Sequence, residues 1–157
     1  MDRNDVISTL NDLIETSKDG EQGFRTYADA VTSPQLKQFF ETAAERCTQG
    51  ALELQNKVRS LGGDPERSGS ASGALHRGWV NIKSVVTGKN EAAVLNECER
   101  GEDVAKQIYG DALKKDLPMD VRSMVERQYQ GVLENHDRVK AMRNSLACSW
   151  GLLFSAA

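Results

Sequence analysis

Residues 45–53 read Glu45-Arg46-Cys47-Thr48-Gln49-Gly50-Ala51-Leu52-Glu53, and residues 126–134 repeat them as Glu126-Arg127-Gln128-Tyr129-Gln130-Gly131-Val132-Leu133-Glu134. With the same shift of 81 positions, seven of the 17 aligned pairs over residues 45–61 are identical, where unrelated segments share about one by composition. The shift also aligns Gly20-Glu21 with Gly101-Glu102. We interpret the chain as a duplicated helical hairpin. The alternative is convergence of two amphipathic helices, which does not by itself require the shared outward-facing Leu, Gln and Glu.

Four stretches of the chain repeat apolar residues at helical spacing. They predict helices over about residues 5–31, 34–61, 90–115 and 118–143. Proline and glycine mark the helix ends at Thr32-Ser33-Pro34, at Gly62-Gly63-Asp64-Pro65 and before Pro118. The pattern predicts an all-α fold, a four-helix bundle made of two antiparallel hairpins joined by a long connection.

The connection between the hairpins spans about residues 62–89. Because a structureless loop of this length is unusual in a compact domain, we expect a short helix over about residues 73–87 that lies across the bundle. Residues 1–143 are then one bundle domain, and residues 144–157 form an apolar tail. The large apolar residues of that tail favour packing against the bundle, against a second copy of the chain or against a partner surface. A frayed tail without a role is an alternative that stays open.

Composition limits the class of protein. The chain has 157 residues and a formal net charge of -3, with both signs spread along it, which fits one domain and argues against a nucleic-acid surface. Three cysteines without a Cys-x-x-Cys spacing favour a reducing cytoplasm over a disulfide framework. We expect neither a signal peptide nor a membrane span.

Two carboxylates, Glu21 and Glu102, fall on or near the apolar stripes of the first and third predicted helices. The hairpin geometry places them opposite residues 45–49 and 126–130 respectively. Burying a carboxylate costs several kcal/mol unless a cation or a hydrogen-bond donor meets it. We therefore expect each carboxylate to have a partner on the neighbouring helix.

The preferred interpretation is an ion-pair network in the core, because arginine cannot lose its proton and therefore pairs with carboxylates instead of ligating a metal. Arg46 is expected to hold Glu21 and Arg127 to hold Glu102, and two glutamines complete the hydrogen bonds. The predicted network comprises Glu21, Arg46, Gln49, Glu102, Arg127 and Gln130.

Two alternatives remain open at this point. One is a weak iron or manganese site, and the other is a pair of solvated carboxylates. A bundle that binds two irons carries Glu-x-x-His on its second and fourth helices, and this sequence has no such motif. The metal ligands would then be Glu21, Glu102, Gln128, Glu53 and Glu134.

The histidines and cysteines carry no catalytic motif. We expect His136 to be a hydrogen-bonded residue at the boundary of the core, and His76 to pack the connecting helix. Cys47 and Cys98 fall on core positions and are expected to act as small buried apolar residues. No nucleophile, base and acid occur at triad-like spacings.

Over about residues 4–143 the chain resembles the ferritin-like superfamily, and within it an uncharacterised bacterial family of four-helix-bundle proteins. The segments that carry the resemblance are Lys18-Asp19-Gly20-Glu21 with Arg25, Leu61-Gly62-Gly63-Asp64-Pro65, Gly73-Ala74-Leu75-His76-Arg77-Gly78-Trp79, Glu97-Cys98-Glu99-Arg100-Gly101-Glu102-Asp103, Glu126-Arg127-Gln128-Tyr129 and His136-Asp137-Arg138-Val139.

The resemblance implies a ferritin-like bundle in the bacterial cytoplasm. Ferritin-like relatives place one Glu on the first and third helices, which Glu21 and Glu102 match. The missing Glu-x-x-His argues against iron storage, ferroxidase and oxygenase activity. We therefore expect a non-catalytic binding or structural module with a degenerate metal site and no cofactor, which self-associates as a dimer and whose residues 146–157 contact a partner. A protein that binds iron or manganese through Glu21 and Glu102 is the alternative.

Overall fold

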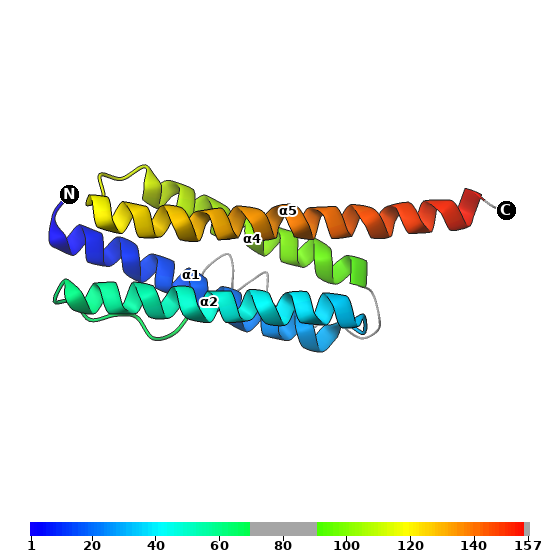
Figure 1. Cartoon of the computed structure of the whole chain (residues 1–157), viewed down its shortest axis with the longest axis horizontal. Coiled ribbons are helices and arrows are strands. Elements are labelled where there is room, and N and C mark those ends of the chain that lie inside the picture. Colours follow the sequence, from blue (N-terminus) through cyan, green and yellow to red (C-terminus); the bar gives the residue numbers. More distant parts are fainter. Residues whose placement is uncertain (70–90, 156–157) are drawn as a thin grey trace.

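The computed structural model describes residues 1–69 and 91–155, which form four helices. In chain order these are α1 (Arg3–Ala30), α2 (Pro34–Ser60), α4 (Glu91–Leu113) and α5 (Met119–Ser155). α1 and α2 form one antiparallel hairpin, α4 and α5 form the other, and the hairpins pack through α1 and α4 (Figure 1). The predicted all-α four-helix bundle is confirmed.

The helix ends follow local rules of capping. The Ser33 hydroxyl accepts a hydrogen bond from the backbone N–H of Leu36, and Pro34 occupies the first turn of α2, where its missing N–H leaves no bond unmade. At the other end of α2, Gly62 adopts a φ of +79°, the left-handed conformation that commonly ends a helix. These signals place the boundaries of α1 and α2 within about two residues of those predicted.

Two side chains hold the helix ends together. The Glu91 carboxylate, in the first turn of α4, accepts a hydrogen bond of 2.9 Å from the backbone N–H of Ser33 in the α1–α2 turn. At the other end of the bundle, the Arg122 guanidinium donates to the carbonyl oxygens of Leu113 and Lys115 at the end of α4. The Glu91 contact therefore joins the two hairpins at one end of the bundle. The Arg122 contacts cap the carboxyl end of α4 at the other end.

The segment after α2 begins by running back along the first hairpin. Asn11 donates to the carbonyl of Asp64 and accepts from the backbone N–H of Glu66, and Gln55 donates to the carbonyl of Glu66. These bonds hold residues 64–66 against α1 and α2. The predicted short helix at residues 73–87, and His76 with it, lies outside the described residues.

The last helix is longer than predicted. We expected it to end near Arg143, but α5 continues to Ser155 and extends beyond the end of the other three helices (Figure 1). The predicted end is therefore wrong. Residues 144–155 contain no proline, and Gly151 is the sole glycine among them, so nothing in this segment stops a helix that is already formed. None of the four described helices has the length and apolar composition that a membrane crossing requires.

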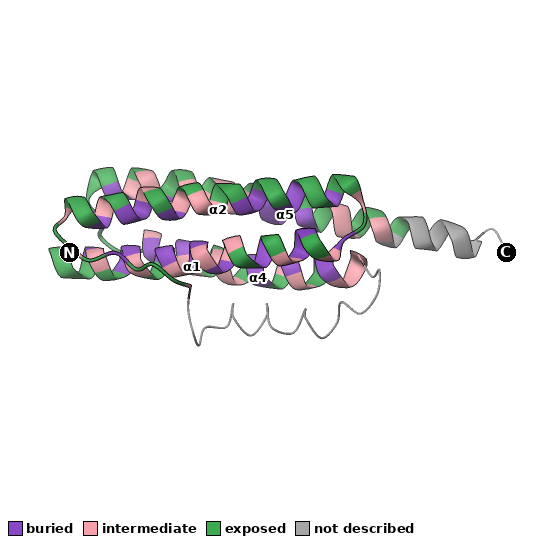
Figure 2. Cartoon of the chain, turned by 90° about the horizontal axis from the view of Figure 1, so that it is seen from below, coloured by how far each residue is buried: buried purple, intermediate pink, exposed green. Residues whose placement is uncertain are grey.

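The hydrophobic core comprises two clusters of buried residues. Figure 2 shows buried residues along the length of the bundle. One cluster lies near the α1–α2 turn and includes Tyr27, Phe40 and Leu95. The other lies near the α4–α5 turn and includes Leu10 and Leu54. Between the clusters, the middle of the bundle carries glycines and polar side chains.

Candidate functional site

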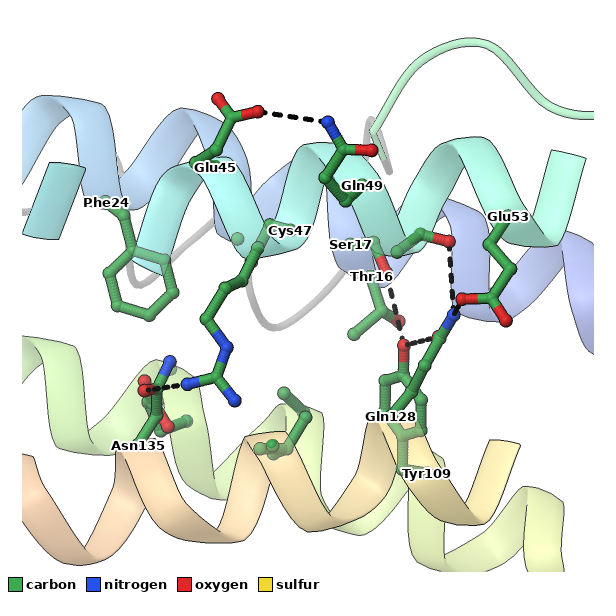
Figure 3. Close-up of a pocket in the computed structure, with 18 of the residues that line it drawn as sticks. Thr16, Ser17, Phe24, Glu45, Cys47, Gln49, Glu53, Tyr109, Gln128 and Asn135 are labelled. Carbon is green, nitrogen blue, oxygen red and sulfur yellow. Dashed lines mark hydrogen bonds between the residues drawn. The ribbon is translucent and has the colours of Figure 1, made fainter. Parts of the chain in front are cut away.

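A cavity of about 380 Å³ occupies the middle of the bundle, between the two apolar clusters (Figure 3). All four helices contribute to its lining. The helix backbones pack closely between α1 and α2, between α4 and α5, and between α1 and α4. By contrast, α2 and α5 are bridged by long side chains, and many of these bridging side chains line the cavity.

Four glycines inside the helices help to make this space. Gly20, Gly50, Gly101 and Gly131 all line the cavity, and the 81-residue repeat aligns the first with the third and the second with the fourth. A Cβ atom at Gly131 would lie 2.9 Å from the Nη2 atom of Arg46, so the missing side chain leaves room for that guanidinium. Glycine within a helix costs roughly 1 kcal/mol relative to alanine. The glycines therefore lower the stability of the helices but leave the space that forms the cavity.

Glu102 is the buried charge-bearing group of this cavity. Its side chain is 5% exposed, and neither carboxyl oxygen has a hydrogen-bond partner among the residues that the structure describes. Burial raises the pKa of Glu102 to about 8, and the nearby Arg46 guanidinium offsets only part of that effect. Glu102 is therefore mostly protonated and neutral at pH 7.

Glu21 does not share this environment. It lies beside the cavity instead of lining it, and its carboxylate is paired with Lys18 at 3.5 Å and Arg25 at 3.3 Å on its own helix. The predicted pairing of Glu21 with Arg46 is therefore wrong. Both ion pairs of Glu21 are formed with neighbours at i–3 and i+4 on the same helix.

The two arginines of the predicted network instead pair across α2 and α5. Arg46 of α2 lies 3.6 Å from the carboxylate of Glu134 of α5, and Arg127 of α5 is paired with Glu53 of α2. The sequence repeat aligns Arg46 with Arg127 and Glu53 with Glu134, so the two pairs are reciprocal. Arg127 is therefore not the partner of Glu102, contrary to the prediction.

The two glutamines of the network also have other positions. Gln49 lines the cavity and donates to Glu45 on the same helix, whereas Gln130 is exposed. Neither is hydrogen-bonded to Glu21 or Glu102 among the described contacts. The predicted network was placed at the correct level of the bundle, but its partners were assigned incorrectly.

A chain of hydrogen bonds crosses the bundle at one end of the cavity (Figure 3). The Tyr109 hydroxyl of α4 lies 3.2 Å from the Ser17 hydroxyl of α1 and donates to the side-chain oxygen of Gln128 of α5. Gln128 then donates to the Gly50 carbonyl and the Glu53 carboxylate of α2. This chain connects all four helices and fixes Gln128, one of the predicted metal ligands.

The cysteines near the cavity are not activated. Cys98 is buried and Cys47 is partly buried, and both are free thiols. Burial raises the pKa of the Cys47 thiol to about 12 and that of the Cys98 thiol well above its usual value, and the nearby Glu102 adds to both effects. Both thiols are therefore protonated at neutral pH, and thiolate chemistry is not favoured.

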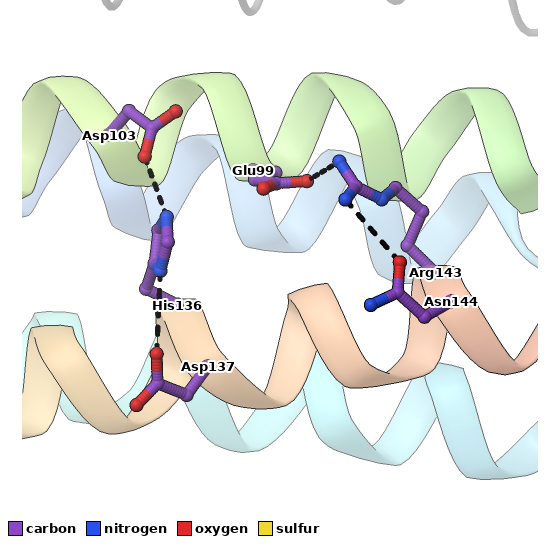
Figure 4. A network of polar contacts seen from close by, with 6 residues as sticks. All are labelled: Glu99, Asp103, His136, Asp137, Arg143 and Asn144. Atoms are coloured by element: carbon purple, nitrogen blue, oxygen red, sulfur yellow. Dashed lines mark hydrogen bonds and ion pairs between the residues drawn. The ribbon is translucent and has the colours of Figure 1, made fainter.

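His136 also has a structural partner (Figure 4). Its Nε2 atom lies 2.6 Å from the carboxylate of Asp103, and its Nδ1 atom lies 3.7 Å from Asp137. Two turns further along α5, Arg143 is paired with Glu99 of α4. The prediction that His136 is a hydrogen-bonded residue at the core boundary is confirmed.

The comparison of sequences assigns a family. The model of a family described as a domain of unknown function (DUF2383) matches residues 5–115. The chain belongs to this family. No curated protein matches the sequence.

Solved structures show that this DUF2383 protein has a ferritin-like fold. A bacterioferritin-related protein from Bacteroides fragilis, described as a dodecameric thioferritin, matches with a TM-score of 0.78 and 15% identity over 96% of this chain and 91% of its own. A protein from Bacillus anthracis described as ferritin-like and diiron-carboxylate matches with a TM-score of 0.67 and 16% identity, over 93% of this chain and 99% of its own.

A larger protein contains the same fold as one of its parts. This is a two-domain protein from Anabaena variabilis with DJ-1/ThiJ/PfpI-like and ferritin-like domains, at a TM-score of 0.74 and 8% identity. The match covers 94% of the DUF2383 chain but 38% of the Anabaena chain. These low identities establish the fold alone.

The residues of this DUF2383 protein do not fit a two-iron carboxylate centre. Within residues 1–69 and 91–155, no three His, Cys, Asp or Glu side chains are arranged to hold a metal ion. Of the predicted ligands, Glu102, Gln128 and Glu53 line the cavity, whereas Glu21 and Glu134 do not. Glu53 is already paired with Arg127, and the Arg46 guanidinium brings positive charge to the same space.

Sequence reasoning missed several residues that shape the cavity. Tyr109 and Asn135 were not identified, although Tyr109 is central to the hydrogen-bond chain and Asn135 accepts a bond of 3.2 Å from Arg46. The glycines at repeat-related positions were a usable signal, because a glycine inside a helical pattern usually has a packing or functional reason. No comparable signal marked Asn135.

Proposed function

We propose that this protein is a non-catalytic ferritin-like binding protein in which a degenerate metal site has become a cavity for a small molecule. The observation that supports the proposal is the unsatisfied carboxyl group of Glu102 in a cavity of about 380 Å³. Ligand sites are typically concave and mostly apolar, with a few polar groups that fix orientation. The cavity has that composition, with Phe24 and Val132 beside Glu102 and Tyr109.

The reactive side chains that the structure describes near the cavity are protonated or hydrogen-bonded, which supports binding over catalysis. The Cys47 and Cys98 thiols are protonated at neutral pH, and His136 is engaged with Asp103. The Tyr109 hydroxyl donates to Gln128 and burial raises its pKa, so it is not a base at neutral pH. The polar groups described here are suited to holding a ligand more than to transferring a proton.

Fragment binding followed by NMR tests this proposal. Benzyl alcohol, benzylamine and benzoate are titrated into the 15N-labelled full chain, and at least one fragment is expected to shift the amide signals of Gly50, Gly101 and Gly131 saturably. Gly50→Leu, which fills the cavity, should abolish the effect. Leu52→Ala is the matched control, because Leu52 is 44% exposed on the same helix. If no fragment binds, the proposal is wrong.

A second candidate function is the binding of iron or manganese through Glu21 and Glu102, with Gln128, Glu53 or Glu134. The unpartnered carboxyl of Glu102 favours it. Elemental analysis of protein from iron- or manganese-supplemented medium separates the two candidates. The binding proposal predicts less than about a tenth of a metal ion per chain, whereas stoichiometric metal that is lost in Glu21→Ala plus Glu102→Ala would favour this second function.

We further infer that the protein is cytoplasmic and self-associates as a dimer. Three free cysteines support a reducing compartment, and the Bacteroides relative is described as dodecameric. The extension of α5 beyond the bundle gives residues 146–155 a position from which to contact a second copy or another partner (Figure 1). Sedimentation of the full chain and of a chain that ends at Arg143 tests this, since loss of the extension should yield monomers.

We also infer that the two hairpins arose by internal duplication. The reciprocal pairs Arg46–Glu134 and Arg127–Glu53 support this origin, as do the matched glycines of the cavity. An experimental structure in which the two hairpins fail to superimpose with residues 45–61 on residues 126–142 would contradict it.

A further inference from the structure

We propose that the cavity selects a small organic monocation, an amine or amidine with an apolar body, whose charged nitrogen meets Glu102. This inference rests on the proposed binding function and adds the chemical class of the ligand. It goes beyond the metal alternative, because the partner of Glu102 is a hydrogen-bond donor carried by an organic molecule.

The carboxyl group of Glu102 is a buried acceptor that needs hydrogen-bond donors. The residue is 5% exposed, and both carboxyl oxygens are without a hydrogen-bond partner among the described residues. A carboxyl group carries several acceptor lone pairs but at most one donor. A buried group of this kind is costly unless it is met by donors. An ammonium or amidinium group supplies two or more N–H donors together with the opposite charge.

The other charges that line the cavity already have partners. Arg46 contacts Glu134 and Asn135, and Arg127 contacts Glu53. Glu45 accepts a hydrogen bond from Gln49. Among the charged residues that the structure describes at this cavity, Glu102 is therefore the one that has neither a hydrogen-bond partner nor an ion-pair partner. A cationic ligand next to Glu102 would lower the pKa of this carboxyl group, hold it as a carboxylate and balance its charge.

The positions of the two arginines argue against an anionic ligand. The side chains of Arg46 and Arg127 are 45% and 64% exposed, so they lie toward the rim of the cavity and are screened by water. Glu102 is 5% exposed and lies deep in the bundle. An anion would have to displace Glu134 or Glu53 from an arginine, and it would still leave Glu102 without a partner.

The space around Glu102 suits an organic body more than a bare metal ion. The cavity volume is about 380 Å³, roughly the volume of a dozen water molecules in the liquid. Phe24, Ala105 and Val132 supply apolar surface. A divalent ion would need several oxygen ligands, whereas Glu53 is committed to Arg127 and Gln128 is committed to Tyr109.

A series of isosteric fragments tests the inference on the full chain. Benzylamine, benzyl alcohol and benzoate have similar shapes and carry a positive charge, no charge and a negative charge at pH 7. Dissociation constants are measured by NMR titration of the wild-type protein. We expect benzylamine to bind at least tenfold more tightly than benzyl alcohol, and benzoate to bind most weakly. This comparison does not depend on the folding of any variant.

Two conservative variants locate the preference. Glu102→Gln should reduce the benzylamine-to-benzyl alcohol preference to less than about threefold. Glu45→Gln removes a carboxylate at the same cavity whose hydrogen bond is local to α2, and it should keep the preference. An unchanged preference in Glu102→Gln would overturn the assignment of the site. Ala105→Leu provides a second test, because it narrows the cavity and should weaken all three fragments.

The outcomes separate this inference from the function on which it rests. Equal affinities for benzylamine and benzyl alcohol would overturn the cation preference and leave the binding function standing. A preference for benzoate would overturn it in favour of an anion site at the arginines. Failure of all three fragments to bind would overturn both proposals. Stoichiometric Mn²⁺ binding that requires Glu102 and displaces benzylamine would replace the organic cation with a metal ion.

Discussion

The two ends of the bundle and its middle are packed in opposite ways. At the ends, large side chains such as Phe40 and Leu54 are fully buried in apolar clusters. In the middle, glycines line a cavity, and Glu102 is buried without a hydrogen-bond partner among the described residues. The ends therefore provide most of the apolar burial that stabilises the fold. The middle is then free to retain an unfavourable group, which is typical of a functional site.

The largest effect is expected at the apolar ends. Phe40 is fully buried against the rings of Tyr27 and Phe24, with ring centroids 5.4 Å and 6.3 Å away. Phe40→Ala should lower the free energy of unfolding by about 4 kcal/mol, because it removes a large apolar side chain and leaves a void. Urea denaturation measures the change. Val132→Ala, at the cavity, is the matched comparison and should cost less than about 1 kcal/mol. Equal costs would contradict the division between ends and middle.

The next effect depends on pH and concerns Glu102. The pKa of Glu102 is about 8 in the folded chain, compared with 4.5 as its ordinary value. Between these pH values the folded state binds more protons than the unfolded state, so stability falls as the pH rises. Between pH 5 and pH 8 this group should account for a loss on the order of 3 kcal/mol.

The variant Glu102→Gln isolates that contribution. It keeps the shape of the side chain but does not titrate, so its stability should change much less from pH 5 to pH 8 than that of the wild type. Urea denaturation at several pH values gives both curves. Parallel curves would show that Glu102 is not responsible for the pH dependence.

A smaller effect of opposite sign is expected at the cavity glycines. A Cβ atom at Gly50 would meet the Gln128 side chain at 3.7 Å, an ordinary contact distance. Gly50→Ala should therefore stabilise the protein by roughly 0.5–1 kcal/mol through helix propensity. Gly131→Ala should gain less, because its Cβ would lie 2.9 Å from Arg46. Thermal unfolding measures both, and marked destabilisation by Gly50→Ala would mean that this glycine serves close packing.

The smallest effect is expected at Arg46. Its side chain is 45% exposed and its partner Glu134 is 69% exposed. Arg46→Ala should therefore change the free energy of unfolding by less than about 1 kcal/mol, as for other surface ion pairs. The pairing with a buried Glu21 that the sequence suggested would instead have cost on the order of 3 kcal/mol. Urea denaturation distinguishes the two values.

Most of the fold could be predicted from the sequence because its determinants are local. Apolar periodicity located the four helices, and Ser33-Pro34 and Gly62 marked their ends. The end of α5 was predicted wrongly because the helix was taken to end with the periodic stretch, at about Arg143. A helix with no proline or capping signal continues to propagate after its amphipathic face has ended.

The position of the site along the bundle axis could be predicted from the sequence, but the contacts between its residues could not. The sequence indicated that Glu102 is buried and that Arg46 and Arg127 lie at the same height, and the structure agrees. It could not indicate that α2 and α5 are bridged by side chains and not by close backbone packing. That spacing lets Arg46 and Arg127 reach carboxylates across the gap. Periodicity assigns a face to each residue, but it does not set the distance between two helices.

The most direct test of the account is the titration of the Glu102 carboxyl carbon, followed by 13C NMR and assigned with Glu102→Gln. We predict a midpoint near pH 8, because the group is buried and has no hydrogen-bond partner among the described residues. A midpoint at or below 4.5 would show that a cation holds Glu102 in its charged form, and would contradict the unpaired carboxyl on which both proposals depend.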